Sequence, residues 1–147
     1  MKVCVLTTSF PRFKGDLSGN FVFEQAHALN AQGIESTVIA PHDLGLKRYE
    51  IMEDVHIRRF RYMLPTRFQI LCYRNGIPDN LKQNVWAKYL LPFLGTGFLV
   101  NTLLHAHKCD IIHAHWTLAG LAGIIAGRML RKPVVMTLHH GSTRSMG

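Results

Sequence analysis

The first 41 residues follow a strand–helix–strand pattern, which restricts the possible fold more than any other feature of the chain. Residues 2–8, KVCVLTT, are a near-continuous apolar run with β-branched side chains, typical of a strand buried on both faces. Residues 20–33, NFVFEQAHALNAQG, carry apolar side chains at helical spacing and end at Gly33, a natural helix stop. Residues 35–41, ESTVIAP, then predict a second strand. This succession predicts a right-handed βαβ unit and therefore a parallel sheet.

The rest of the chain continues the alternation of strands and helices. Apolar alternation predicts a third strand at 54–63, in which a slip between Ile57 and Phe60 indicates a bulge, and 64–80 predicts an irregular connection. The later elements are a helical region at 81–108 interrupted by Pro92, Gly95 and Gly97, a strand at 110–116, a helix at 117–130 and a strand at 133–138. The prediction is one α/β domain over residues 1–147. Its open parallel sheet has helices on both faces and the doubly wound strand order 3-2-1-4-5.

The composition indicates a folded protein of a reducing compartment. At 147 residues, 48% of them hydrophobic, the chain is long enough to bury a core. The three cysteines are odd in number, widely spaced and without a CxxC motif, so they predict no disulfide framework. No cleavage site follows the short apolar run at the N-terminus. We therefore expect a cytoplasmic protein.

The net charge of +8 calls for an anionic partner or a solvated basic face. Much of this charge lies between residues 47 and 74, and a cationic face of this kind attracts nucleic acid, anionic lipid or a phosphorylated small molecule. No nucleic-acid motif is present, so we expect no nucleic-acid partner. The apolar stretch Leu90–Leu104 is shorter than the roughly 20 residues of a membrane span, and predicts a core helix or one lying against a membrane. We expect weak attraction to anionic membranes and a peripheral location on the inner face.

The histidines do not form a recognisable metal motif. His113 and His115 are two residues apart on a predicted strand and share a face, as a metal pair would. His105 and His107 have the same spacing on a predicted helix, where they point to different faces. Because neither CxxC nor HExxH accompanies them, we expect no metal site.

Three loops converge instead on the carboxyl ends of the predicted strands, where open α/β sheets bind their ligands. The first carries Gly15 and Gly19 and leads through Asn20 into a helix whose N-terminus favours a phosphate. His113, His115 and Trp116 close the fourth strand, and His139, His140 and Gly141 follow the fifth. Packing or turn formation explains each of these residues singly, but together they predict a binding site. The loop at 9–21 is too long for the GxGxxG fingerprint, so a dinucleotide cofactor is not expected.

Three ordered segments resemble family 4 glycosyltransferases of the GT-B fold. TSFPRFKGDLSGNFVFEQAHALNAQGIESTVIAP is similar to the family's opening strand, glycine loop and helix. DIIHAHWTLAGLAG resembles its D-hydrophobic-hydrophobic-H-x-H strand with the following helix, and KPVVMTLHHGS resembles its P-hydrophobic-V-x-T-x-HG segment. The resemblance covers nearly the whole chain. It implies a Rossmann-like domain that faces a second one across a cleft.

The resemblance also implies roles for individual residues. Gly15, Gly19 and Asn20 would lie at the donor diphosphate, and His139 or His140 beside the transferring sugar. The family usually has one histidine before the glycine and this chain has two, so both assignments stay open. His113, His115, Trp116 and Gly141 would contact the acceptor.

The resemblance further implies that a C-terminal domain with an E-x7-E motif binds most of the nucleotide-sugar donor. No such motif is present, so we expect an acceptor-side domain that lacks its last strands and its donor-binding partner. The expected function is transfer of a sugar, with retention of configuration, to a cell-envelope polysaccharide or lipid-linked glycan, without a cofactor. A separately encoded C-terminal half or self-association would complete it. The alternative is a non-catalytic subunit that recruits a catalytic partner to a membrane.

Overall fold

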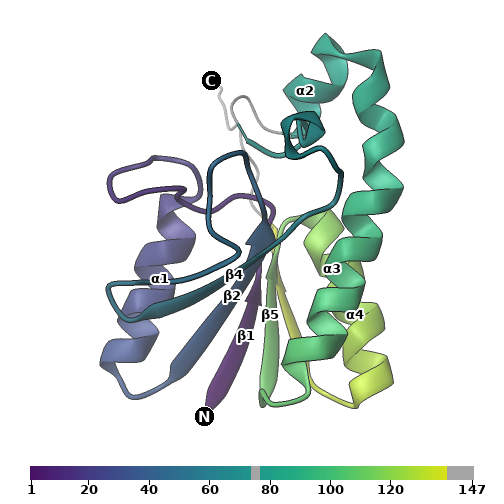
Figure 1. Ribbon diagram of the computed structural model, residues 1–147. Coiled ribbons are helices and arrows are strands. Elements are labelled where there is room, and N and C mark those ends of the chain that lie inside the picture. The colour runs from purple at the N-terminus through teal and green to yellow at the C-terminus, as the bar shows by residue number, and fades with distance from the viewer. Residues whose placement is uncertain (74–76, 139–147) are drawn as a thin grey trace, which may run out of the picture.

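The computed structural model describes residues 1–73 and 77–138, in which six strands form one sheet between helices (Figure 1). The strands are β1 (Lys2–Leu6), β2 (Glu35–Pro41), β3 (Tyr49–Met52), β4 (Val55–Phe60), β5 (Ile111–His115) and β6 (Val134–Thr137). Their order is β3-β4-β2-β1-β5-β6, and every neighbouring pair is parallel apart from β3 with β4. The predicted order of five strands is confirmed. The sheet is nevertheless mixed, because the unpredicted β3 adds an antiparallel edge.

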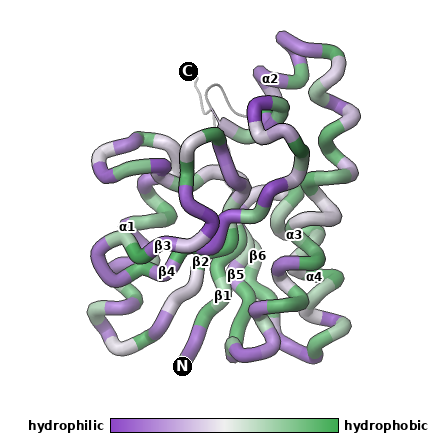
Figure 2. Tube along the Cα trace, in the orientation of Figure 1, coloured by the Kyte–Doolittle hydropathy of each residue, from purple (hydrophilic) through white to green (hydrophobic). Residues whose placement is uncertain are grey.

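The helices cover both faces of the sheet, as predicted. They are α1 (Asn20–Ala31), α2 (Ile77–Gln83), α3 (Leu91–Ala106) and α4 (Thr117–Leu130), with 3-10 turns η1 (Thr66–Phe68) and η2 (Val85–Leu90). Figure 1 shows α1 on one face and α3 with α4 on the other. Val22 and Ala26 of α1 bury their side chains against one face of β1, β2 and β4. Leu94 and Phe98 of α3 belong to the core on the opposite face. Hydrophobic residues run along the central strands between these layers (Figure 2).

The predicted bulge in the third strand is wrong, because β4 is regular and one of its inward positions carries a charge. Val55, Ile57 and Arg59 alternate on the α1 side of the sheet, and all three are buried. Phe60 faces the other side, where its ring lies 4.8 Å from that of Phe98. The apolar pattern therefore looks shifted only because an arginine occupies a core position.

The predicted breaks in the helical region at 81–108 are also wrong. Pro92 lies in the first turn of α3, where its missing N–H costs nothing. The chain instead changes direction at Asn84, whose side-chain oxygen accepts a hydrogen bond from the N–H of Trp86 at 3.0 Å. Gly97 lies inside α3, and a Cβ there would come within 2.6 Å of the Phe60 ring. This glycine therefore lets the helix approach β4 without ending the helix.

Candidate functional site

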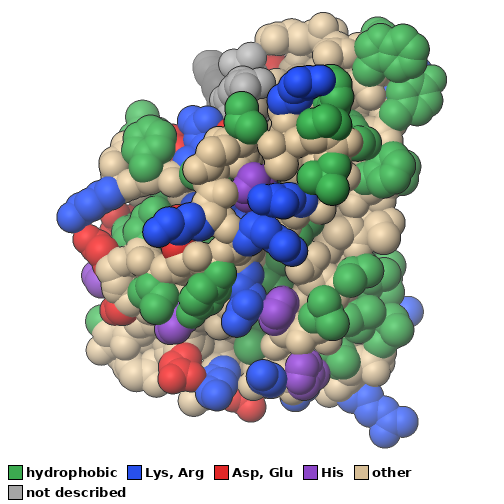
Figure 3. All heavy atoms as spheres, in the orientation of Figure 1, with side chains coloured by type: hydrophobic (Ala, Val, Ile, Leu, Met, Phe, Trp, Pro, Cys, Tyr) green, Lys and Arg blue, Asp and Glu red, His purple; other side chains and the backbone are tan. Residues whose placement is uncertain are grey.

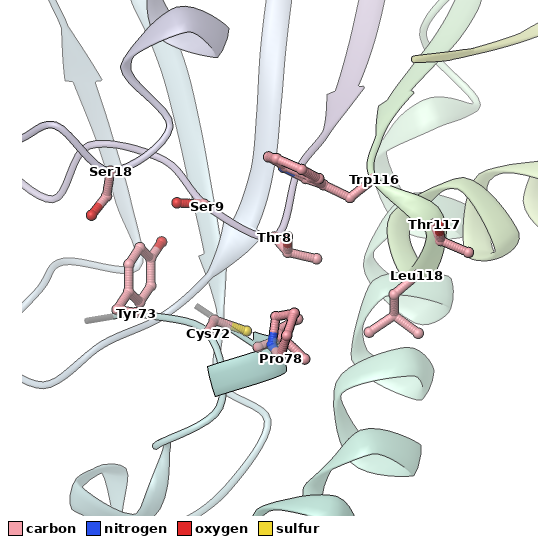
Figure 4. Close-up of a pocket in the computed structure, with 10 residues that line it drawn as sticks. Thr8, Ser9, Ser18, Cys72, Tyr73, Pro78, Trp116, Thr117 and Leu118 are labelled. Carbon is pink, nitrogen blue, oxygen red and sulfur yellow. The ribbon is translucent and has the colours of Figure 1, made fainter. Parts of the chain in front are cut away.

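A cavity of about 500 Å³ opens at the carboxyl ends of β1 and β5 (Figure 4). Its lining comes from the chain after β1, the glycine loop (residues 10–19), the segment before α2, the first residues of α2, and the end of β5 with the start of α4. The lining residues are Thr8, Ser9, Ser18, Cys72, Tyr73, Ile77, Pro78, Trp116, Thr117 and Leu118. This is the end of the sheet at which the sequence predicts a site. None of the lining residues is charged at neutral pH, so the cavity offers hydroxyl groups and apolar walls.

Trp116 contributes the largest side chain in this lining, and its backbone is strained. Its φ of 76° and ψ of 159° lie in a region that costs a non-glycine residue roughly 1–3 kcal/mol. Its N–H donates to the carbonyl of Thr137 at 3.1 Å, and its carbonyl accepts from Gly120 at 2.9 Å. These two bonds join the end of β5 to β6 and to α4, so they hold the strained conformation. The predicted site residue Trp116 therefore lies at the cavity.

His113 and His115 lie below the cavity lining, on the α1 side of the sheet. His115 is buried, and its ring centroid is 4.3 Å from that of His113. The Nε2 atom of His113 lies 2.9 Å from the hydroxyl oxygen of Thr137. Phe21, in the first turn of α1, makes an edge contact with His115 at 6.2 Å. Neither histidine is among the residues that line the cavity. Their contact with an acceptor stays a prediction.

Gly19 is needed at its position for a backbone reason. It precedes α1 with a φ of 62°, and a Cβ there would lie 2.1 Å from the carbonyl oxygen of Ser9. The glycine loop therefore packs directly on the chain that leaves β1. Ser9 itself is held in a tight turn, because the Thr7 hydroxyl donates to its carbonyl at 2.7 Å. The close approach brings Ser18 to the cavity next to Ser9.

Charged groups fix the rest of the glycine loop. The backbone N–H and Nε of Arg12 both donate to one oxygen of Asp16 at 2.9 Å, and Ser18 donates to the other at 3.3 Å. Burial opposes the negative charge of Asp16, but these hydrogen bonds outweigh it and lower the pKa of the carboxyl. Arg12 also reaches Asp43 at 3.3 Å and lies over the ring of Tyr73 at 5.5 Å. The loop is therefore tied to another wall of the cavity.

Gly15 and Asn20 lie apart from the cavity. Together with Glu24 and Glu53 they line a separate hollow of about 380 Å³ between the glycine loop and β3. None of the predicted phosphate-binding residues Gly15, Gly19 and Asn20 is therefore among those that line the main cavity, which the glycine loop reaches through Ser18. His139, His140 and Gly141 lie outside the described residues.

The sequence does not predict the cavity wall formed by Cys72 and Tyr73, which lies in the segment predicted as irregular. The Tyr73 hydroxyl donates to the carbonyl of Pro41 at 2.9 Å, and the Asn80 side chain donates to the carbonyls of Leu71 and Tyr73. Burial raises the pKa of the Cys72 thiol and of the Tyr73 phenol well above their usual range. Both side chains are therefore neutral, and Cys72 is not an activated nucleophile.

The described part of the chain contains no group of three or more His, Cys, Asp or Glu side chains that could hold a metal ion. What the cavity presents is a largely apolar wall that includes the Trp116 indole, with a few hydroxyl groups along it. Figure 4 shows Ser9, Ser18 and Tyr73 to one side of Trp116 and Thr8, with Leu118 on the other side. Hydroxyl groups both donate and accept hydrogen bonds, so this lining suits a neutral, polyhydroxylated ligand better than a charged one.

Comparison with known proteins identifies the family of the chain. One solved structure with similarity is SsfS6, a glycosyltransferase of Streptomyces sp. SF2575, at 18% sequence identity and a TM-score of 0.47. That match covers 94% of this chain and 39% of the other, so this chain spans well under half of that protein's length. No curated protein matches the chain. The profile of Glycosyltransferase Family 4 matches residues 18–146, nearly the whole chain. The chain therefore belongs to Glycosyltransferase Family 4.

Proposed function

We propose that the chain is the acceptor-side domain of a retaining glycosyltransferase. The enzyme would move a sugar from a nucleotide-sugar donor to a cell-envelope polysaccharide or a lipid-linked glycan. Membership of Glycosyltransferase Family 4 supports the reaction class. The observation that carries the acceptor assignment is the uncharged cavity beside Trp116, which lies at the ligand-binding end of the sheet.

The lining suits an acceptor sugar. Thr8, Ser9 and Ser18 present side-chain oxygens, which pair with sugar hydroxyls in either hydrogen-bonding direction. The apolar face of the Trp116 indole would cover the carbon face of the sugar ring. During transfer with retention, the acceptor oxygen bonds to the sugar carbon on the face from which the diphosphate leaves. The bond from that carbon to the diphosphate breaks, and the proton of the acceptor hydroxyl passes to the departing diphosphate. The negative charge of the departing diphosphate needs positive donors, which the lining of the cavity does not supply.

The donor phosphates would therefore lie outside the cavity, towards the N-terminus of α1 at Gly19 and Asn20. A helix N-terminus favours an anion at this position. His139 or His140 would lie beside the transferring sugar, and no metal ion is needed for this arrangement. Each of these roles is part of the proposal.

Tryptophan fluorescence tests acceptor binding, because the chain has two tryptophans and only Trp116 lines the cavity. In a Trp86→Phe chain, Trp116 is the sole reporter. We expect a saturable change in its emission with oligosaccharides of the envelope. Thr8→Val removes one hydroxyl at nearly constant volume and should weaken binding about fivefold, since a hydrogen bond contributes about 1 kcal/mol. The matched change Thr96→Val, on the exposed side of α3, should leave binding unaltered.

A transfer assay tests whether the acceptor cavity alone, without a donor-binding domain, supports transfer. We expect the 147-residue chain to transfer no sugar from any nucleotide donor, because its cavity has no group that stabilises the leaving diphosphate. Turnover of a radiolabelled donor by this chain, abolished by His139→Ala, would refute this expectation. A folded Trp86→Phe chain that responds to no saccharide would overturn the acceptor assignment.

A further inference from the structure

The helix α3 and the turn η2 before it are apolar on two opposite faces. One face lies in the core: Ala87, Leu90, Leu94, Phe98, Thr102 and Ala106. The other face is exposed and forms what we call the outer stripe: Trp86, Tyr89, Phe93, Val100 and Leu104. Members of the outer stripe are three, four or seven residues apart, so they lie on one side of the helix. A contiguous exposed apolar surface of this kind marks an interaction site.

The side chains of the outer stripe contribute little to the core, as their exposed fractions show. Trp86 is 71% exposed, Phe93 54% and Leu104 59%. Figure 3 shows hydrophobic side chains along the α3 side of the molecule, next to a group of Lys and Arg side chains over the strands. The stripe therefore borders a basic surface.

The charged residues within η2, α3 and the chain that joins them to α2 have one sign. Residues 80–109 contain no Asp or Glu, but Lys82 and Lys88 lie at one end of the stripe and Lys108 at the other. The Lys88 ammonium lies 5.3 Å from the centroid of the Tyr89 ring. At the far end, Lys108 lines a hollow of about 250 Å³ in which the basic residues Lys2 and Arg58 outnumber the one carboxylate, Glu35. Cations at both ends of an apolar stripe complement an apolar layer with an anionic surface.

We propose that the outer stripe docks the protein on an anionic lipid membrane, with α3 lying in the plane of the interface. Tryptophan and tyrosine concentrate at the boundary between headgroups and acyl chains, where Trp86 and Tyr89 would lie. Lys82, Lys88 and Lys108 would contact the anionic headgroups, with their aliphatic stems along the apolar surface. The docking does not depend on the proposed transfer reaction.

Two other uses of the stripe fit less well. The segment Val85–Ala106 is long and apolar enough to cross a membrane by length and composition alone. Crossing would pull Leu94 and Phe98 out of the core that they form with β1, β2 and β4. A second copy of the chain packed stripe to stripe would bring the lysines at the ends of one stripe against those of the other. Docking on an anionic lipid surface leaves Leu94 and Phe98 in the core and places the lysines next to opposite charges.

Vesicle binding tests the docking, with Trp86 as the reporter in a Trp116→Phe chain and sedimentation of the unaltered chain as a second measurement. We expect a blue shift of Trp86 emission and co-sedimentation with vesicles of equal parts phosphatidylglycerol and phosphatidylcholine. Vesicles of phosphatidylcholine alone should bind at least tenfold more weakly, since each cation near the surface contributes about a fivefold gain. Binding to anionic vesicles should fade towards about 1 M salt, where the Debye length is about 3 Å.

Two double variants compare α3 with α4. Phe93→Gln with Val100→Gln removes two outward apolar side chains of the outer stripe and should weaken binding at least tenfold. Leu121→Gln with Ile125→Gln removes a similar exposed surface from α4 and should leave binding unchanged. Three results would overturn the proposal: equal binding to neutral vesicles, equal losses from the two double variants, or a dimer that the Phe93→Gln and Val100→Gln variant dissociates.

Discussion

The two edges of the sheet are held by different kinds of interaction. The described ion pairs all join residues 2–59, and two of them lie at β3 and its turn into β4, where Glu50 pairs with Arg59 and Glu53 with Lys14. Among the described residues of β5, α4 and β6, the structure shows no ion pair. There α4 packs on the strands through small residues, and a Cβ on Gly127 would come within 2.3 Å of Val134. One edge is therefore fixed by charge, the other by close backbone packing.

The difference extends to how each edge strand is protected. Glu50 of β3 is directed inward, where it accepts a hydrogen bond from the buried guanidinium of Arg59. An inward charge on a short edge strand discourages further strand pairing. β6 has no charged residue, and Val135 is 51% exposed. Within the described residues, this sheet therefore has one blunted edge and one that is open to another strand.

The largest expected effect comes from removing the charge that Arg59 faces. The Arg59 side chain is fully buried and donates to Glu50 and to the carbonyl of Pro11 at 2.8 Å. Glu50→Ala leaves this cation without its counter-charge and should lower the free energy of unfolding by about 3–5 kcal/mol. Urea denaturation measures the loss. Lys14→Ala breaks the exposed pair with Glu53 and should cost less than about 1 kcal/mol. Similar losses in the two variants would contradict a charge-dependent β3 edge.

Gly19→Ala should have the next largest effect, because two costs add. The left-handed backbone of Gly19 costs an alanine about 1–2 kcal/mol, and the clash with Ser9 adds at least about 1 kcal/mol. Gly33→Ala is the matched control, since Gly33 has a φ of 84° and open space around its Cβ position. Equal losses of unfolding free energy in the two variants would show that the glycine loop does not pack tightly on Ser9.

The sequence predicts these five strands because each carries apolar, β-branched side chains, and their order follows from the doubly wound topology. β3 escapes prediction because Tyr49–Met52 is half exposed, and its turn into β4 uses Glu53 with a φ of 53° in place of a glycine. The regular alternation of β4 is not evident in the sequence, because Arg59 occupies an inward position and a charged residue is expected to point to solvent. Trp116 could be placed at the site from its position after a strand. Cys72 and Tyr73 could not, since their segment has no periodicity and depends on tertiary hydrogen bonds.

A smaller effect should appear when pH changes the charge of His42 near the β3 side. His42 is buried, with Nε2 2.7 Å from the carbonyl of Leu46 and Nδ1 2.9 Å from the Gln69 amide. Burial lowers its pKa, with a contribution from Arg61 and Arg59 and an opposing one from the Leu46 carbonyl and Asp43. The unfolded state therefore binds more protons, and stability falls as pH decreases through about 6.5.

The His42→Gln variant should show a shallower loss of unfolding free energy below about pH 6.5. His27→Gln should change the pH dependence of the unfolding free energy in the opposite direction. A hydrogen bond to Asp54 raises the pKa of His27, so its contribution is complete below about pH 6.5 and is lost as pH rises through the folded pKa. Denaturation curves from pH 5 to 8 measure both slopes. An unchanged slope in His42→Gln would show that the neutral imidazole is not retained in the fold.

The smallest effect on stability, but a clear one on association, is expected at β6. The register with β5 directs the N–H groups of Val134 and Met136 away from the sheet, so they are free to pair with another strand. Val135→Lys places a charge on this exposed edge and should change the free energy of unfolding by less than about 0.5 kcal/mol. Light scattering should show that the unaltered chain self-associates as its concentration rises and that the variant does not. Hydrogen exchange sharpens the test, because the Val134 and Met136 amides should exchange quickly in a dilute monomer. Slow exchange there would mean that the β6 edge is already covered, and that the contrast between the two edges is false.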